Sequence, residues 1–389
     1  MVFENELLAR DVWVWGARNV GPIIANLLMG SGGSIIGFID NSAEIQGKKV
    51  LGKPVWKPDE IYGKIRKEDI VLCCLTAPNN ASIIKQLNEH GIFKNVIEWD
   101  PVKYVKHGGF QESLAYFLEE GYEDRIVSKC CCQVDFEQEY FKRIASELAR
   151  DDRHRFNRKL WEFVYIVHAL EENGMLADGR KGLGFAVGEE PLPSYFAAKG
   201  VSVLATDLSI ESETAALWAQ TGQNALGDIS KLFNPNIVTK AKFDENVTYM
   251  DLDMNHIPDD IGQFDFCWSS CAIEHVGSLE LSKQFLKNMI KVLKPRGIAV
   301  HTTEFNISSD EETIETGSSV MYRRKDFEEI QEWMNDNNCE ITLSFKRTQK
   351  EADMYVPIPP YPGGDERNHL NLIIDRFVCT SYALLIKKR

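Results

Sequence analysis

The chain has 389 residues, of which 44% are hydrophobic and 26% are charged, and its formal net charge is −14. This length predicts more than one domain, and the composition is that of a folded globular protein rather than a disordered one. The negative charge argues against a nucleic-acid partner, because phosphates require a basic surface.

The sequence predicts a cytoplasmic protein without a membrane span. No apolar run approaches the roughly 20 residues that a helix needs to cross a bilayer. Residues 1–11 carry acidic side chains where a signal peptide would carry basic ones. The nine cysteines show no C-x-x-C spacing. We therefore expect neither a disulfide framework nor a zinc ribbon, and no metal site.

The first hundred residues alternate between strand and helix patterns. Strands are expected at 11–16, 34–41, 69–76 and 94–99, and helices at 19–30 and 81–90. This alternation predicts a parallel sheet with helices packed on it. Charged residues and paired glycines interrupt the pattern at 100–110. We place the first domain at residues 1–105.

Residues 106–175 are expected to form a helical connector. From 111 to 175 the apolar positions recur at three- and four-residue spacing, without strand alternation. The basic cluster at 153–159 is typical of a solvated helix face, and the alternative is a local pocket for an anionic small molecule. The same two interpretations apply to the basic residues 323–325.

The alternation returns in the third segment, residues 176–389. Strands are expected at 182–187, 201–207, 247–253, 264–270 and 297–305, and helices at 191–200, 212–222, 279–295 and 325–336. Two late β-rich runs, 339–347 and 377–388, have no helix between them. They should pair antiparallel, because a parallel return needs a long crossover. An irregular insert, 348–375, separates them, and its residues 355–370 are either a lid or a surface loop without function.

Residues with chemical roles follow the strands of this third segment. A glycine turn from Gly184 to Gly188 follows the first strand, where a backbone can approach a cofactor closely. Asp207 ends the second strand, where a carboxylate can accept hydrogen bonds from both ribose hydroxyls. Asp253 and Met254 end the third strand, where an adenine would meet an acceptor and an apolar surface.

Together with "FDFCWSSCAIEH" (264–275) and "LKPRGIAV" (293–300), these residues resemble the S-adenosylmethionine-dependent methyltransferases of the seven-stranded Rossmann-like class. The resemblance covers about residues 176–389 and implies a mostly parallel seven-stranded sheet that ends in an antiparallel hairpin. The whole chain would then be α/β, with two Rossmann-like domains joined by the helical connector. The resemblance also implies S-adenosylmethionine as cofactor. The expected cofactor contacts are Gly184, Gly188, Glu189, Asp207, Leu208, Asp253, Met254 and Ser269.

Three positions depart from the pattern of that class. Gly182 stands where the class has an acid, Ala186 replaces the middle glycine of the turn, and Arg296 replaces a glycine of "LKPGG". Glu189 or Glu190 could replace the missing carboxylate, although acids in a first helical turn also favour the helix dipole.

The expected catalytic residues follow the fourth and fifth strands. A hydroxyl acceptor is a weak nucleophile, so a general base helps its methylation. The candidates are Glu304, Glu274 and His275, and we expect His301 to lie inside its strand. His275 is also explained as a packing residue.

The N-terminal domain has a glycine turn of its own, from Gly16 to Gly21. Arg18 projects where a pyrophosphate would approach, and Asp40 ends the second strand as a ribose-binding acid does. With the string "GFIDNSAEIQGKKVLGKPVW", this domain resembles the small nucleotide-binding Rossmann domains attached to sugar-modifying and bacterial glycan-assembly enzymes. The resemblance implies binding of a nucleotide-linked sugar, or a docking or dimerising role.

We therefore expect a methyltransferase that acts on a small-molecule or saccharide acceptor in surface-glycan biosynthesis, with a hydroxyl as the acceptor group. The acceptor can be linked to a nucleotide, and a homo-oligomer remains open. One alternative is an NAD-dependent oxidoreductase or epimerase, against which the lack of a Tyr-x-x-x-Lys pair at the expected distance counts. The other is a non-catalytic scaffold with a nucleotide-binding fold.

Overall fold

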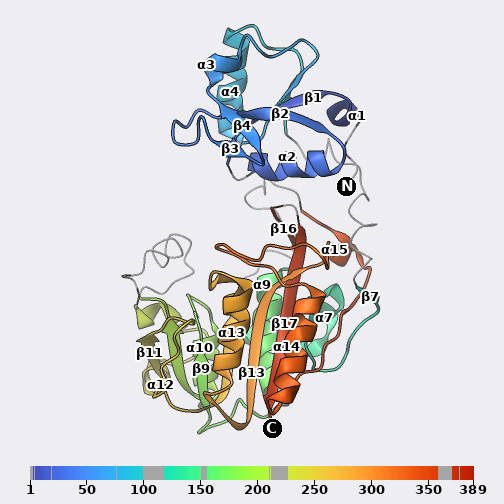
Figure 1. Ribbon diagram of the computed structural model, residues 1–389. Helices are drawn as coiled ribbons and strands as arrows, with labels where there is room; N and C mark the ends of the chain where they lie inside the picture. Colours follow the sequence, from blue (N-terminus) through green and yellow to red (C-terminus); the bar gives the residue numbers. More distant parts are fainter. Residues whose placement is uncertain are drawn as a thin grey trace. The chain divides into compact units, whose positions relative to one another are not determined.

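The structure is a computed structural model that describes residues 3, 5–18, 20–75, 77–99, 118–149, 156–209, 211, 227–357, 370–375 and 377–389. The chain divides into two compact units, seen in Figure 1. The first unit consists of Met1–Tyr116 with Val356–Asp365 and Leu372–Val378, and the second of Phe117–Tyr355 with Glu366–Asn371 and Cys379–Arg389.

The first unit is built on a mostly parallel sheet. Its strands are β1 (Asp11–Trp15), β2 (Ser34–Ile39), β3 (Lys49–Val50), β4 (Lys53–Trp56), β5 (Ile70–Cys73) and β6 (Val96–Glu98), in the order β3-β4-β2-β1-β5-β6. Its helices are α1 (Asn5–Leu8), α2 (Val20–Gly30), α3 (Pro58–Ile61) and α4 (Ala77–Glu89). Only β3 and β4 pair antiparallel, in a short hairpin that the sequence did not predict.

The second unit is built on a larger sheet. Its strands along the main path are β9 (Lys181–Gly184), β10 (Ser202–Asp207), β11 (Val247–Asp251), β12 (Phe264–Ser270), β13 (Leu293–Asn306), β14 (Cys339–Glu340) and β17 (Phe377–Lys388). Their order is β11-β10-β9-β12-β13-β17-β14. Pairing is parallel from β11 to β13, whereas β17 lies antiparallel to both β13 and β14.

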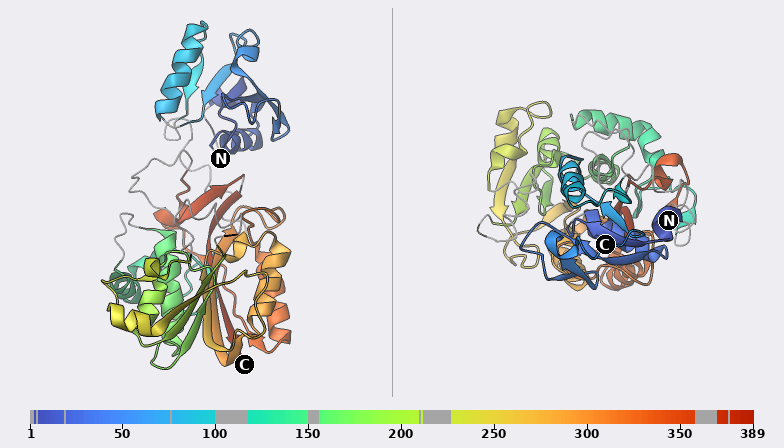
Figure 2. Two further views of the ribbon diagram at one scale, coloured as in Figure 1. Left: turned by 90° about the vertical axis from the view of Figure 1, so that its left-hand side faces the viewer. Right: turned by 90° about the horizontal axis from the view of Figure 1, so that it is seen from above.

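Shorter strands complete the sheets of this unit. β8 (Lys129–Cys130) and β16 (Asn371–Ile374) pair with β17, and β7 (Glu119–Glu120) pairs with β15 (Lys346–Arg347). The larger sheet is covered by helices on both faces, with α13 (Leu279–Met289) and α14 (Arg324–Asp336) on one face and α9 (Arg158–Glu172) and α10 (Leu192–Ala198) on the other (Figure 2). The remaining helical segments are α7 (Gln133–Glu137), α8 (Glu139–Glu147), η1 (Ile229–Leu232), α12 (Lys240–Asn246), η2 (Ile273–His275) and α15 (Glu351–Met354).

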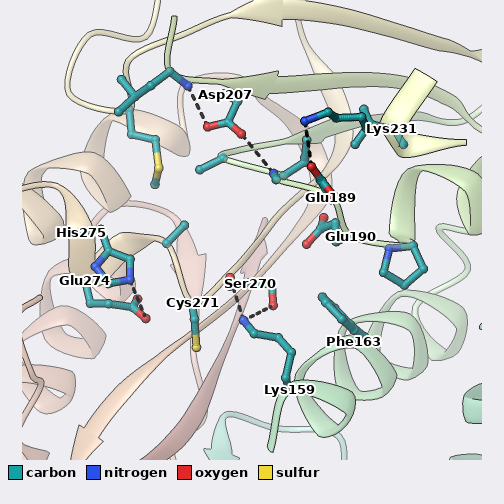
Figure 3. Close-up of a pocket in the computed structure, with 18 of the residues that line it drawn as sticks. Lys159, Phe163, Glu189, Glu190, Asp207, Lys231, Ser270, Cys271, Glu274 and His275 are labelled. Carbon is teal, nitrogen blue, oxygen red and sulfur yellow. Dashed lines mark hydrogen bonds and ion pairs between the residues drawn. The ribbon is translucent and has the colours of Figure 1, made fainter. Parts of the chain in front are cut away.

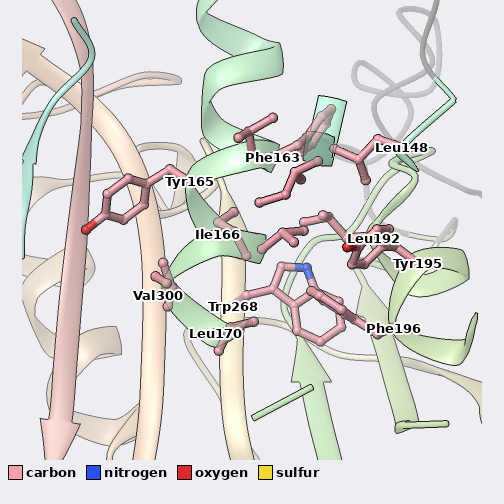
Figure 4. Packing of buried hydrophobic residues seen from close by; sticks show 14 of the residues in the cluster. Leu148, Phe163, Tyr165, Ile166, Leu170, Leu192, Tyr195, Phe196, Trp268 and Val300 are labelled. Carbon is pink, nitrogen blue, oxygen red and sulfur yellow. The ribbon is translucent and has the colours of Figure 1, made fainter. Parts of the chain in front are cut away.

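A large aromatic side chain, Trp268 of β12, sits at the centre of the core between this sheet and α9 and α10 (Figure 4). Its ring lies 4.9 Å from that of Phe196 and 5.8 Å from that of Phe266, measured between centroids. The room for it comes from β9, because a Cβ atom on Gly184 would lie 2.4 Å from the indole of Trp268. Gly182 makes the same room for Phe266.

The mixed α/β class with mostly parallel sheets is confirmed. The expectation of a helical segment over 111–175 is incomplete, because its described part also contains β7 and β8. The insert 348–375, expected to be irregular, contains α15 and β16. The helix expected at 212–222 and the centre of the insert, 358–369, lie outside the described residues. Within the described ranges, no helix has the length and apolar character needed to cross a membrane.

The packing of Trp268 predicts the effect of a side chain at Gly184. We expect Gly184→Ala to lower the free energy of unfolding by about 1–3 kcal/mol, because the new methyl group overpacks the core. Gly63→Ala is the control, since a Cβ atom there meets nothing within 4 Å. Chemical denaturation of the two variants tests this. Unchanged stability of Gly184→Ala would show that this glycine does not serve packing.

Candidate active site

A cavity of about 1130 Å³ lies at the carboxyl ends of the parallel strands of the second unit, which is where such sheets bind ligands (Figure 3). Its walls come from the segments that follow β9, β10, β11 and β12, from the end of β13, and from the first turns of α9. One cavity therefore collects the residues that the sequence places at the ends of separate strands.

The turn after β9 forms the wall beside β10. Ala186 and Gly188 adopt left-handed backbone conformations, with φ of 48° and 53°. The N–H group of Gly188 donates to one carboxylate oxygen of Asp207 at 3.1 Å, and the N–H of Leu208 donates to the other at 2.8 Å. Carboxylate oxygens can each accept more than one hydrogen bond. Asp207 is thus fixed at the cavity wall in a position to accept from ligand hydroxyls as well.

Two acids follow this turn, and their environments differ. Glu189 pairs with Lys231 at 2.9 Å, with much of its side chain exposed. Glu190 is buried and accepts a hydrogen bond of 2.6 Å from Nε1 of Trp268. Burial, with a smaller contribution from Asp207, raises the pKa of Glu190 to about 8. Both acids line the cavity, and Glu190 is the buried one of the two.

The residues after β11 form the next part of the wall. Asp253 accepts from the backbone N–H of Asn255 at 2.8 Å and lies 2.8 Å from Nδ1 of His256. Met254 is buried and lines the cavity beside it. An exposed carboxylate next to an apolar surface suits a base such as adenine.

The eight expected cofactor contacts do not all reach the cavity. Six of them line it, namely Gly188, Glu189, Asp207, Leu208, Asp253 and Met254. Gly184 lies within β9 against Trp268, and Ser269 is buried 2.8 Å from Nδ1 of His301. Side chains alternate along a strand, so it is the next residue, Ser270, that faces the cavity.

At the far end of the cavity, α9 supplies a buried ion cluster centred on Glu162. This carboxylate is fully buried, 2.7 Å from Nζ of Lys159 and 3.5 Å from Nη1 of Arg158. The hydroxyls of Ser270 and Ser381 donate to it at 3.1 and 2.6 Å. Burial raises its pKa, but Lys159 and Arg158 outweigh this effect and lower the pKa of Glu162 to about 2. Two cations are thereby held at the cavity wall.

Glu304, the first catalytic candidate, lies near the end of β13. It is buried, and its Oε1 atom is 2.6 Å from Nη2 of Arg158. The thiol of Cys379 lies 3.1 Å from its other oxygen. Glu304 therefore reaches the cavity as the partner of an arginine.

Glu274 and His275 reach the cavity from η2, which follows β12. Glu274 is fully buried, and burial raises its pKa. Its Oε2 atom accepts a hydrogen bond of 3.0 Å from Thr303, and its Oε1 atom has no hydrogen-bond partner among the described residues. Nδ1 of His275 lies 2.7 Å from the carbonyl oxygen of Ser318, and Nε2 lies 3.9 Å from Oε1 of Glu274. All three catalytic candidates thus line one cavity.

The sequence interpretation missed several residues of this site. Arg158 and Lys159 belong to the basic cluster 153–159, for which an anion pocket was one of two interpretations, and both line the cavity. The available signal was Glu162, which follows these cations at helical spacing but is flanked by aromatic residues. The other basic run, 323–325, lies outside the cavity wall, and its Arg323 pairs with Asp326 at the start of α14.

Comparison with known protein families identifies the segment that forms much of this cavity. Residues 183–301 match a family model described as a methyltransferase domain. The chain therefore contains a methyltransferase domain. The expected enzyme class and the expected cofactor, S-adenosylmethionine, are therefore confirmed.

Solved structures match this chain with low sequence identity. Magnesium protoporphyrin IX methyltransferase from Synechocystis with bound S-adenosylhomocysteine is 11% identical, covers 66% of this chain and 97% of its own, and has a TM-score of 0.36. An S-adenosylmethionine-dependent methyltransferase from Clostridium acetobutylicum is 15% identical, with coverage of 64% and 97% and a TM-score of 0.33. A comparison with curated proteins found no significant match. These scores are too low to support conclusions about the acceptor.

The raised pKa of Glu190 predicts that cofactor binding depends on pH. Below about pH 8 the free protein holds Glu190 protonated, whereas a cationic methyl donor favours its ionised form. We expect the affinity for S-adenosylmethionine to rise with pH by up to about tenfold per unit, and to level off above the pKa of Glu190. Calorimetry across this range measures the slope.

Glu190→Gln should flatten that slope, and Glu189→Gln, at the neighbouring exposed acid, should leave it unchanged. Any ionisation of the donor itself contributes equally to the slopes of all variants, so the difference between the slopes reports on Glu190. Identical slopes in the wild type and in Glu190→Gln would contradict a role for Glu190 beside the cofactor.

Proposed function

We propose that this methyltransferase transfers the methyl group of S-adenosylmethionine to a hydroxyl group of a small-molecule or saccharide acceptor in surface-glycan biosynthesis. The observation that supports this most strongly is the single cavity that joins the Asp207 turn to Glu304, Glu274 and His275. Donor-type and base-type residues open onto the same space, as transfer between two bound molecules requires.

The proposed donor site lies along the walls after β9, β10 and β11. Asp207 would accept the ribose hydroxyls, and Asp253 with Met254 would hold the adenine. Gly188 would allow the backbone close to the methionine part, and Glu190 would face its cationic end. The carboxylates Asp207, Glu190 and Asp253 fit a ligand that carries a positive charge.

The size of the cavity supports a second ligand. Pockets for a single drug-sized ligand typically measure about 300–1,000 Å³, and this cavity of about 1130 Å³ exceeds that range. Lys159, Glu274 and His275 lie apart from the Asp207 turn along the wall (Figure 3). Glu304 lines the same cavity and pairs with Arg158, the neighbour of Lys159 on α9. We assign this end of the cavity to the acceptor.

The acceptor end has the groups that methylation of a hydroxyl requires. The bound donor supplies a methyl group on a good leaving group, so positioning of the acceptor oxygen provides much of the rate gain. A carboxylate or a neutral imidazole can take the hydroxyl proton. We propose Glu304, Glu274 and His275 as the candidates that accept this proton. Glu304 is held in place by Arg158.

We propose that the first domain, residues 1–105, binds a nucleotide-linked sugar or serves as a docking or dimerising module. Asp40 accepts N–H groups from Ala17 at 2.9 Å and from Ser42 at 2.8 Å. Arg18 turns to Ser42 and to Glu44, at 3.0 and 2.7 Å. An arginine beside the turn supports recognition of a phosphate-bearing ligand more than hydride transfer.

The proposal is tested by incubating the enzyme with S-adenosylmethionine and a panel of free and nucleotide-linked sugars. Production of S-adenosylhomocysteine together with the mass gain of one CH₂ group on a sugar is the expected result. Methylation of an amine or of a carbon atom, with no activity on hydroxyls, would contradict the proposed acceptor group.

Asp207→Asn tests the donor site. The amide keeps the size of the side chain but loses the charge, and hydrogen bonds to charged groups contribute about 1.5–3 kcal/mol. We expect the affinity for S-adenosylhomocysteine to fall by roughly tenfold to a hundredfold in calorimetry. Asp251→Asn, at the exposed end of β11, is the control. Unchanged affinity of Asp207→Asn would argue against ribose binding here.

Glu304→Gln tests the acceptor end. We expect kcat to fall roughly a hundredfold or more, as for removal of a general base, while the affinity for S-adenosylhomocysteine changes little. Glu311→Gln, at an exposed glutamate, should leave both quantities unchanged. Wild-type turnover by Glu304→Gln would remove this residue from the reaction.

A further inference from the structure

We propose that Cys271, Glu274 and Glu304 form a binding site for a divalent transition-metal ion at the acceptor end of the cavity, and that Zn²⁺ fits this site best. This site is additional to the donor site. Its role in the reaction, discussed below, rests on the proposed function.

The first support is the geometry of the three side chains. One ligand atom from each, the sulfur of Cys271 and a carboxylate oxygen of Glu274 and of Glu304, lie within 4.8 Å of one another. Zn²⁺ binds sulfur at about 2.3 Å and oxygen at about 2.0–2.2 Å, so ligand atoms around it lie about 3.5 Å apart. Closing the observed cluster onto an ion therefore needs side-chain movements of only about 1 Å.

The second support is independent of this spacing and comes from Glu274. Its carboxylate is fully buried at the cavity wall, and its Oε1 atom has no hydrogen-bond partner among the described residues. A buried polar atom without a partner is unfavourable. A cation in the cluster would satisfy this oxygen, which the surrounding protein leaves unsatisfied.

His275 lies beside this cluster but outside the group of three ligands. Its Nδ1 atom lies 2.7 Å from the carbonyl oxygen of Ser318, and its Nε2 atom lies 3.9 Å from Oε1 of Glu274. The proposed protein ligands are therefore Cys271, Glu274 and Glu304. A water molecule or the acceptor oxygen would take the fourth position, as in zinc sites with three protein ligands.

The ligand types select the metal. A thiolate among the ligands favours Zn²⁺ or a related transition metal over Mg²⁺ and Ca²⁺, which prefer oxygen ligands only. Arg158 opposes a cation, because its guanidinium lies 2.6 Å from Oε1 of Glu304 and 3.9 Å from the sulfur of Cys271. Lys159 is a second cation at this wall, but Glu162 pairs with both Lys159 and Arg158 and offsets part of their charge. The two carboxylates and a Cys271 thiolate exceed the positive charge that remains. Oε2 of Glu304 faces only the weak thiol donor of Cys379 among its described contacts.

An ion at this place would assist methylation of a hydroxyl. A divalent metal lowers the pKa of an oxygen ligand and orients it. A metal-bound acceptor hydroxyl would lose its proton more readily, and the proton would pass to His275, which lines the cavity beside the three ligands.

The test is a titration of the chelator-treated full-length protein with Co²⁺, a spectroscopic substitute for Zn²⁺. We expect a thiolate-to-Co²⁺ charge-transfer band that saturates at one equivalent and disappears when Zn²⁺ is added. Cys271→Ser should abolish the band, and Glu274→Gln should weaken Co²⁺ binding by about tenfold or more. Cys339→Ser is the matched control, since this cysteine is buried in β14 outside the cavity wall.

A wild-type protein without the band, or a band unchanged in Cys271→Ser, would overturn the proposal. Calorimetry with S-adenosylhomocysteine on the same metal-free samples shows whether each variant is folded. It also separates this proposal from the proposed function, because donor binding does not require the ion. If Cys271→Ser fails to fold, Glu274→Gln and the displacement by Zn²⁺ in the wild type decide the question.

Discussion

The structure of the second unit depends on the placement of Trp268 in β12. Its indole occupies the space that a side chain at Gly184 would take, so β9 and β12 approach closely at this point. Its Nε1 atom donates to Glu190, which lies just past the turn that carries Gly188. One side chain therefore connects the hydrophobic core to the wall of the cavity. The glycine in β9 serves this packing, and the glycine in the turn serves the backbone conformation beside Asp207.

At the opposite end of the cavity, a buried carboxylate holds the side chains around it in place. Glu162 of α9 contacts Lys159 and Arg158 on its own helix, Ser270 of β12 and Ser381 of β17. Burying a charge is costly unless it is paired and hydrogen-bonded, and here each interaction offsets part of that cost. The result is that Arg158 is fixed where it meets Glu304. The end of the cavity that we assign to the acceptor thus contains charges of both signs, whereas the end that we assign to the donor is lined mainly by acids.

The sequence predicts what depends on local pattern. The run 264–270 is rich in aromatic residues and lies between polar segments, and β12 has these bounds. Asp207 was placed correctly at the end of its strand because strand ends are marked by the change in pattern. The sequence did not predict the features that depend on contacts between distant parts of the chain. All residues of β12 are buried, so alternation could not tell that Ser270 and not Ser269 faces the cavity. Glu162 was missed for a similar reason, because helical spacing of opposite charges normally indicates an exposed ion pair.

The two glycine turns of the chain share one backbone hydrogen bond but differ in the side chains beside it. In each, an acid at the end of the second strand accepts an N–H group from the turn after the first strand, with Asp40 bound to Ala17 and Asp207 bound to Gly188. This shared hydrogen bond stabilises the turn in both units. In the first unit Arg18 then folds toward Glu44 over the carboxyl end of the sheet. In the second, Val187 packs into the core and leaves the backbone of Gly188 at the cavity wall. The two turns therefore share their strand-to-helix pattern and differ in the side chains beside them, Arg18 in the first unit and Val187 in the second.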